Sequence, residues 1–437
     1  MKNLKIVLSM LILSIAALLQ PLWADNRPEM DHSSAPTTIE LTLPKAEQLA
    51  LKRNPLIHAA DKREDAASKQ KLQTLAPADP TFMIERDGES GGPLNLDGPG
   101  VNTWMVSEDL GFPGQSLVKV DVDNAETAKQ KAMADDARRL ILLQTRQTFW
   151  EFYYRQKVFG ILDEAQKQWK ILSQGLRSRE LTGQWLSMKT VRAQMEIANS
   201  TNDLFTASQS LEVSRVHFNN LFDLPMDTGF TLKEVPDLAA INGTLEGYIQ
   251  KARDDNPKVE AAQREVDEKT AEAHVAAFSH LPDFNIRLMG TRNPDDTAFS
   301  SYAVRLGVSI PLFFPMKQTQ AADQANDLAD ASRFELTARW DETHHMVEES
   351  YINAQSAWRL WKLYQEGGLL EQAQRAWKAT ELAYRNEQIS LSDFVDNYNL
   401  YLETLESYYK AQADYGKALA EFHYQIGDLP VAGNEKE

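Results

Sequence analysis

The chain has 437 residues and a net charge of −17, because 46 lysines and arginines stand against 63 aspartates and glutamates. This acidic excess argues against a nucleic-acid partner, since binding phosphates needs a basic surface. The absence of cysteine excludes disulfides, thiolate metal sites, cysteine nucleophiles and lipid attachment through cysteine.

Residues 1–24 have the pattern of a secretory signal peptide. Lys2 and Lys5 precede an apolar run from Ile6 to Leu19, and Ala24 supplies the small residue of a cleavage site. The run is shorter than a transmembrane helix requires, so an uncleaved anchor is the weaker alternative. No later stretch approaches about eighteen consecutive apolar residues. An exported chain of this kind would cross a membrane only as β-strands.

The remaining sequence consists of two related halves, which we place at residues 25–226 and 227–437. Asn54-Pro55 recurs as Asn256-Pro257, and Phe112-Pro113 recurs as Phe314-Pro315, at a constant offset of 202 residues. Near the end of each half, Asp-Leu-Pro recurs three residues later than this offset requires. The duplication predicts one architecture for both halves.

Each half is predicted to contain a helix followed by two strands. The helices cover residues 56–76 and 258–278, and a proline follows each. Runs of alternating apolar and polar residues come next, and about nine or ten such residues suit a tilted strand that crosses a bilayer. The alternating apolar positions are Phe82, Ile84, Trp104 and Val106 in the first half, and Phe284, Ile286, Leu288, Tyr302, Val304, Leu306, Val308 and Ile310 in the second.

Long helical segments follow the strands. From about Gln115 to about Gln174 the chain has no proline and one glycine, which predicts a helix of roughly 90 Å at 1.5 Å per residue. In the second half, an apolar residue recurs every seventh position from Leu363 to Tyr384. This spacing predicts the seam of a coiled-coil hairpin. We expect the aromatic stripe to be core packing rather than a cofactor site.

The strand count points to an assembly of several chains. Four strands cannot close a membrane barrel alone, because open edges leave unpaired amides in hydrocarbon. Three chains would supply twelve strands, enough for a water-filled lumen. The long helices would continue this lumen as a tunnel.

The sequence resembles the TolC-like outer-membrane efflux protein family over essentially its whole mature length. The motifs that carry the resemblance are the duplicated Asn-Pro pairs, the strand starts Pro80-Thr81-Phe82 and Pro282-Asp283-Phe284, the strand end Ser309-Ile310-Pro311-Leu312-Phe313, the segment Tyr384 to Val395, and the closing Ile426-Gly427-Asp428-Leu429-Pro430. Two departures stand out. Ser107-Glu108-Asp109-Leu110 replaces the pattern of the second half, so strand two is expected to end differently, and no cysteine follows the signal, so no acyl anchor is expected.

The resemblance implies a mainly α fold with a β membrane part. Long coiled-coil helices would form a periplasmic α-barrel, and four β-strands per chain would contribute to a trimeric twelve-stranded outer-membrane β-barrel. The expected location is the outer membrane of a Gram-negative bacterium, with most of the chain in the periplasm. The expected partners are two further copies in a homotrimer, a periplasmic adaptor protein, an inner-membrane efflux pump and outer-membrane lipid.

The resemblance places functional residues at the tips of the helical hairpins. Asp393 and Asp396 share a helix face, and six such carboxylates in a trimer would attract cations, so we predict a periplasmic gate there. Capping of the returning helix by Asp393 is an equally weighted alternative. In the same segment, Glu387 replaces a glycine of the family pattern. Adaptor contacts are expected at Gly183, Ser187, Ser390 and Ser392.

The sequence predicts a transport protein rather than an enzyme. It contains no phosphate-binding glycine loop, no nucleophile elbow and no His-Glu-x-x-His pair. The adjacent His344 and His345 would point about 100° apart on a helix. We therefore expect no catalytic residue, cofactor or metal site.

The predicted function is the outer-membrane duct of a tripartite efflux system, which passively exports substrates delivered by an inner-membrane pump and a periplasmic adaptor. The compact tips favour the heavy-metal branch of the family, with metal cations as cargo. An outlet for type I protein secretion or multidrug efflux stays open, as does a non-transport periplasmic coiled-coil scaffold.

Overall fold

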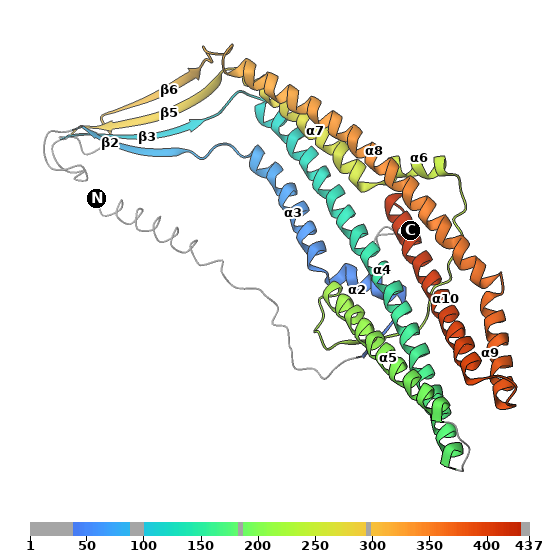
Figure 1. Ribbon diagram of the computed structural model, residues 1–437. Helices are drawn as coiled ribbons and strands as arrows, with labels where there is room; N and C mark the ends of the chain where they lie inside the picture. Colours follow the sequence, from blue (N-terminus) through green and yellow to red (C-terminus); the bar gives the residue numbers. More distant parts are fainter. Residues whose placement is uncertain (1–37, 88–99, 182–186, 294–298, 430–437) are drawn as a thin grey trace.

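The computed structural model describes residues 38–87, 100–181, 187–293 and 299–429. Within them, an elongated helical body carries a curved β-sheet at one end and two helical hairpins at the other (Figure 1). The first half contains β1 (Thr38–Leu41), α2 (Leu43–Arg53), α3 (Pro55–Leu75), β2 (Thr81–Asp87), β3 (Val101–Asp109), α4 (Gln115–Leu181) and α5 (Ser187–Leu221). The second half contains β4 (Gly229–Leu232), α6 (Leu245–Asp255), α7 (Pro257–Phe278), β5 (Asp283–Arg292), β6 (Ser301–Ser309), α8 (Gln318–Gln365), α9 (Leu369–Arg385) and α10 (Leu391–Gln425).

The duplicated Asn-Pro pairs begin α3 and α7 and join each of them to another helix. The side-chain oxygens of Asn54 and Asn256 each accept a hydrogen bond of 2.9 Å from the backbone N–H two residues later. Their amide nitrogens donate to Leu221 O and Gln425 O, at 2.9 and 2.8 Å. These carbonyls belong to the last residues of α5 and α10. In each half, one buried side-chain amide thus satisfies a free backbone N–H at the start of one helix and a free carbonyl at the end of another.

The repeat extends further toward the N-terminus than the sequence motifs indicated. Helices α2 and α6 each have 11 residues and begin 202 positions apart. Each is capped by a threonine, Thr42 or Thr244, whose hydroxyl accepts a backbone N–H. The short strands β1 and β4 pair in parallel beside this region. The boundary between residues 226 and 227 stays a prediction.

The four long strands form one antiparallel sheet in the order β2-β3-β5-β6, so β2 and β6 are its open edges. The predicted apolar positions within the strands share one face, and Phe82, Val106, Leu288 and Val304 form an exposed row across it, whereas Ile310 follows the end of β6. Strand β3 runs two residues further than β6 in the repeat alignment, because it continues to Asp109. The different ending that was expected for the second strand is therefore confirmed.

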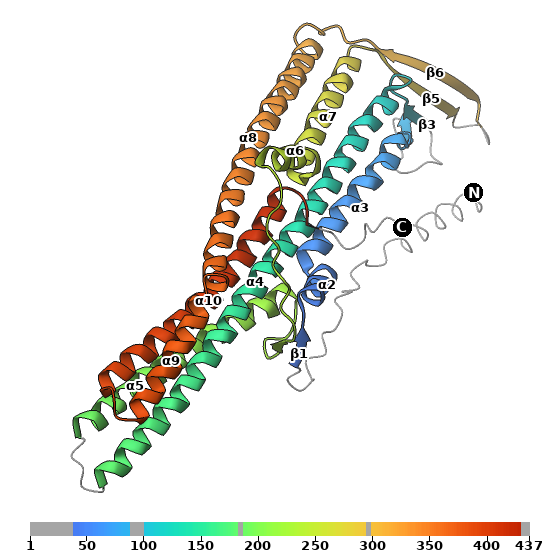
Figure 2. The same ribbon diagram turned by 90° about the vertical axis from the view of Figure 1, so that its right-hand side faces the viewer.

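Below the sheet, α3, α4, α7 and α8 lie side by side in that order (Figures 1 and 2). Farther from the sheet, α5 and α10 pack on α4, and α9 packs on α10. Helix α4 has 67 residues and runs through both parts, as the absence of proline predicted. None of the helices in the described part of the chain has a segment long and apolar enough to cross a membrane.

The second half interrupts its long helical segment at a place that the seven-residue spacing did not indicate. The chain leaves the helix after Gln365 and resumes it at Leu369. Gly368 has φ = +67°, and a Cβ on Gly367 would collide with the carbonyl of Leu363. Both positions favour glycine, because it alone adopts left-handed and crowded conformations at little cost.

Aromatic residues pack between the two helical hairpins, which confirms the prediction that the aromatic stripe is core packing. Trp169 is 2% exposed, and its ring centroid lies 5.2 Å from that of Tyr398. Trp377 approaches Tyr398 to 4.2 Å and Phe394 to 5.2 Å. Such contacts bury large apolar areas and hold α4, α9 and α10 in a fixed order.

Candidate functional site at the helical tips

Helix α5 begins, and α9 and α10 meet, at the ends of the hairpins that are farthest from the sheet (Figure 1). Gly183 falls between the described residues of α4 and α5, so its position lies outside the described part of the chain. Ser187 is the first residue of α5. Ser390 and Ser392 lie at the start of α10. The adaptor contacts proposed for these four residues stay predictions.

Asp393 closes a capping box at the start of α10. Its backbone N–H donates to Ser390 Oγ at 3.1 Å, and its carboxylate accepts the Ser390 N–H at 3.2 Å and the Ser390 hydroxyl at 2.7 Å. This arrangement satisfies backbone donors that a helix start otherwise leaves free. Asp393 therefore takes part in capping α10, as the alternative proposed. The gate role of Asp393 stays a prediction.

Asp396 lies one turn further along α10 and faces the other hairpin. Its Oδ1 is 3.4 Å from Nη2 of Arg192 on α5, and its Oδ2 is 3.5 Å from the hydroxyl of Ser392. The Arg192 and Asp396 side chains are 44% and 67% exposed, so solvent screens their attraction and the pair contributes about 0–1 kcal/mol. A carboxylate with a cationic neighbour adds less negative charge to the tip than an unpaired one.

The sequence analysis missed Arg192, although the duplication contained a signal for it. Helices α5 and α10 both have 35 residues and begin 204 positions apart. On this alignment Arg192 corresponds to Asp396, and Lys189 corresponds to Asp393. The first-half tip thus carries bases at the positions where the second-half tip carries acids.

Glu387 occupies the turn between α9 and α10 with φ = +59°. This left-handed conformation is disfavoured for residues with a Cβ and suits glycine. The structure therefore gives a physical reason why a glycine is expected at this position of the tip. Glutamate here retains the turn but adds strain of order 1 kcal/mol.

The described ranges contain no group of three or more His, Cys, Asp or Glu residues that could hold a metal ion. His344 and His345 lie on α8, far from the tips, and the His344 ring stacks on Trp340 with centroids 6.0 Å apart. This packing accounts for the first histidine without a metal ion.

Comparisons with known proteins agree with this architecture. A family model described as outer membrane efflux protein matches residues 248–423. No curated protein matches the sequence. Among solved structures, the CmeC outer membrane channel of Campylobacter jejuni is 14% identical, with a TM-score of 0.75 over 91% of this chain and 90% of that chain.

Two further channels show the same fold. The outer membrane protein VceC of Vibrio cholerae is 14% identical, with a TM-score of 0.70 over 88% of this chain and 96% of its own. The open-state MtrE outer membrane channel of Neisseria gonorrhoeae is 15% identical, with a TM-score of 0.69 over 88% of both chains.

The family model covers most of the second half, and the first half repeats its order of helices and strands, except that α4 is one helix where the second half has α8 and α9. The fold similarity extends over both halves. Residues 248–423 therefore carry the outer membrane efflux protein domain, and both halves of the chain share the fold of these outer-membrane proteins.

Proposed function

We propose that three copies of this chain form the passive outer-membrane duct of a tripartite efflux system, fed by an inner-membrane pump through a periplasmic adaptor. The observation that carries the proposal is that the molecule has two open edges along its length, each formed by one strand and two helices. One edge is formed by β2, α3 and α5, and the other by β6, α8 and α9 (Figures 1 and 2). All elements of one edge belong to the first half, and all elements of the other belong to the second.

A second copy of the chain fits these edges. Large apolar side chains on α3, α5, α8 and α9 are between 62% and 76% exposed in the single chain, namely Leu72, Phe205, Phe334 and Leu382. Edge strands β2 and β6 also leave backbone donors and acceptors unpaired. Head-to-tail joining of two different edges generates a closed ring. Three copies supply twelve strands, which leave room for an aqueous lumen.

The hairpin tips are proposed to form the periplasmic gate. The Arg192–Asp396 pair joins the two hairpins of one chain, so their separation requires this contact to break. The nearby Asp393 carboxylates would add negative charge around the axis and favour cations. Single-channel conductance in planar bilayers tests the assignment, because Asp393→Ala and Asp396→Ala channels with unchanged conductance and cation block would remove it.

The tips are also proposed to contact the adaptor, because they extend farthest from the sheet. A photo-crosslinking amino acid at Gly183, Ser187, Ser390 or Ser392 should capture the adaptor in cells. The same probe at Lys62 on α3, closer to the sheet, is the control. Equal capture from both regions would reject a tip-specific contact.

We propose heavy-metal cations as the cargo class, supported by the acidic composition of the chain. The family is a transport family, and we propose no catalytic role for the chain. A scaffold without transport would have no use for a sheet with an exposed apolar face. Growth of a deletion strain on copper, silver, zinc, cobalt and drugs would identify the cargo, and loss of protein secretion alone would favour the type I outlet.

Trimer formation has a direct test in outer-membrane fractions. The protein should migrate as a trimer in SDS without heating and as a 49.4 kDa chain, less any signal peptide, after boiling. Phe205→Asp should weaken the trimer because it places a charge in the proposed contact. A monomeric wild-type protein in the outer membrane would contradict the ring.

A further inference from the structure

The face of the sheet opposite the apolar one carries a row of three methionines. Met83 on β2 pairs with Met105 on β3, and Met105 pairs with Met289 on β5. Ala303 continues the row on β6. Residues that are directly opposite in adjacent antiparallel strands project from the same face. Three thioether side chains therefore lie next to one another at one level of the sheet.

The duplication does not explain this row. At the offset of 202 residues, Met83 corresponds to Asn285 and Met105 to Gly307, whereas Met289 corresponds to Asp87. The three methionines thus come from positions that are not equivalent in the two halves. They meet only because of the strand register.

The surroundings of the row are polar, which argues against ordinary core packing. One neighbouring row consists of Glu85, Thr103, Thr291 and Ser301, and the other consists of Thr81, Ser107, Arg287 and Arg305. The large apolar side chains of the sheet project from the other face. Met83 is 47% exposed even in the single chain. Because the apolar face turns toward lipid in the proposed duct, the methionine face lines its lumen.

Thioethers are neutral and polarisable ligands that select soft metal ions such as Cu(I) over hard cations. Facing Cβ atoms on neighbouring strands are about 4.5–5.5 Å apart. The unbranched methionine side chain has three rotatable bonds, so sulfur atoms from adjacent strands can converge on one ion. We propose that Met83, Met105 and Met289 form a binding site for a soft monovalent cation, Cu(I) or Ag(I), in the lumen of the duct.

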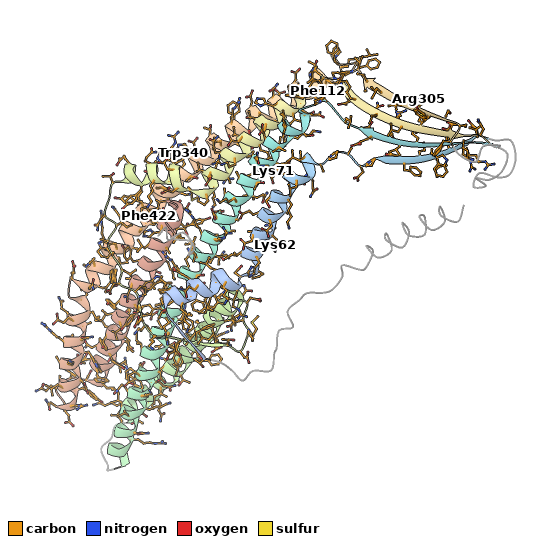
Figure 3. All side chains as sticks on the ribbon, turned by 180° about the vertical axis from the view of Figure 1, so that it is seen from behind. Lys62, Lys71, Phe112, Arg305, Trp340 and Phe422 are labelled. Atoms are coloured by element: carbon orange, nitrogen blue, oxygen red, sulfur yellow. The ribbon has the colours of Figure 1, made fainter. Side chains whose placement is uncertain are left out.

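The charges on the two sides of the row differ, because Glu85 lies in the row farther from the helices and two arginines lie in the row closer to them. Arg287 and Arg305 lie directly opposite each other, one row closer to the helices than the methionines, and Figure 3 labels Arg305 on the sheet. Two guanidinium groups oppose hydrated divalent cations, whose binding depends on charge. Thioether coordination depends on softness instead of ligand charge. The site therefore retains Cu(I) and Ag(I) and discriminates against Mg²⁺, Ca²⁺ and Zn²⁺.

This inference rests on the proposed duct, because a ring of three chains would bring nine methionines to one level of the lumen. It also deepens the cargo proposal by naming soft monovalent cations. Metal binding and channel conductance are separate measurements. A wild-type channel that conducts but binds no Ag(I) would reject the site and leave the duct intact, whereas a wild-type protein that forms no channel would reject the duct.

The test is titration of the purified full-length trimer with Ag(I) in chloride-free buffer. The wild type should bind about one Ag(I) per methionine row, and Met83→Leu/Met105→Leu/Met289→Leu should weaken this binding at least about tenfold. Leucine nearly conserves methionine volume, so the sheet should remain folded. The control variant Met188→Leu/Met226→Leu/Met316→Leu removes three exposed methionines elsewhere and should bind as the wild type does. Equal binding by both triple variants would overturn the site.

A second measurement uses the unmodified protein and does not depend on the triple variant. Hydrogen peroxide converts exposed methionine to its sulfoxide, and bound Ag(I) should protect Met83, Met105 and Met289 by occupying their sulfur atoms. Peptide mass spectrometry should show that Zn²⁺ gives no such protection. Uniform oxidation of all methionines with and without Ag(I) would also reject the proposal.

Discussion

Arg192 and Asp396 occupy corresponding positions in the two halves of the chain, and they form an ion pair with each other. The pair spans 3.4 Å between the guanidinium Nη2 and the carboxylate Oδ1. An ancestral duplication would have placed the same residue at both positions. Because the two positions now carry opposite charges, their side chains attract each other. The contact joins α5 to α10 at the end of the molecule where the gate is proposed.

Arg192→Ala and Asp396→Ala should each increase the open fraction of the channel by a small factor. An exposed pair contributes at most about 1 kcal/mol per chain, and salt should reduce the difference from wild type. Planar-bilayer recordings at low and high ionic strength measure both effects. Arg375→Ala removes an arginine whose partner Glu371 lies on the same helix, and it should leave gating unchanged.

Ser390→Ala should lower the stability of the second tip by about 1 kcal/mol, because the start of α10 loses its capping hydroxyl. Ser392→Ala should cost less, since that hydroxyl makes one long contact of 3.5 Å with Asp396. Local hydrogen exchange in the first turn of α10 measures the loss. Equal exchange in the two variants would contradict the capping role.

Gly368→Ala should destabilise the junction between α8 and α9 by about 1–2 kcal/mol, because alanine is strained at φ = +67°. Gly175→Ala is the matched control within α4, where no atom would lie within 4 Å of the new Cβ. That change should stabilise its helix by about 0.5–1 kcal/mol. Thermal unfolding should therefore shift in opposite directions for the two variants.

Glu387→Gly should stabilise the turn between α9 and α10 by roughly 1 kcal/mol, since glycine adopts φ = +59° without steric cost. Glu387→Ala separates the backbone effect from loss of the carboxylate, because alanine retains the strain. A glycine variant no more stable than the alanine variant would show that the left-handed turn carries no cost.

His423 should contribute to the pH dependence of stability just below neutrality. Burial lowers the pKa of this histidine, and Arg146 and Lys251 lower it further, while Asp428 opposes the shift. A depressed pKa means that the unfolded chain binds the proton first, so stability is present above pH ~6.5 and is lost as pH falls through the folded pKa.

The variant that tests this is His423→Gln, which removes the titration and keeps a polar side chain. Its stability should fall less than that of the wild type between pH 7 and 5, by about 1.4 kcal/mol for each unit of pKa difference. His345→Gln, at an exposed position on α8, is the control. Parallel pH profiles of unfolding for His423→Gln and the wild type would contradict the expected linkage.

Much of the fold was readable because it is encoded by local periodicity and by the duplication. The bounds of α3 and α7 fall within one residue of the predicted helices, since Asn-Pro and the later proline mark their ends. Alternation assigned Phe82 and Leu288 to one face before any strand pairing was known. Capping of the returning helix by Asp393 was also weighed from the sequence, whereas the capping box with Ser390 was found in the structure.

Other features depended on contacts between distant segments. The apolar spacing from Leu363 to Tyr384 predicted a hairpin seam, but it did not show that the helix is interrupted at Gly367 and Gly368. Apolar periodicity reports which face is buried, and a short break that keeps the same face does not disturb it. Arg192 was likewise missed, because the sequence alone does not state which helix lies opposite Asp396.

The sequence by itself therefore determined the repeat, the order of the longer helices and strands, and the two faces of the sheet, since each follows from the residues nearest to it. Only the tertiary structure decided that Arg192 meets Asp396 and that Met83, Met105 and Met289 share one row. Hydrogen-bonded register and helix packing fix such neighbours, and a shift of one residue would have turned the methionines to the other face.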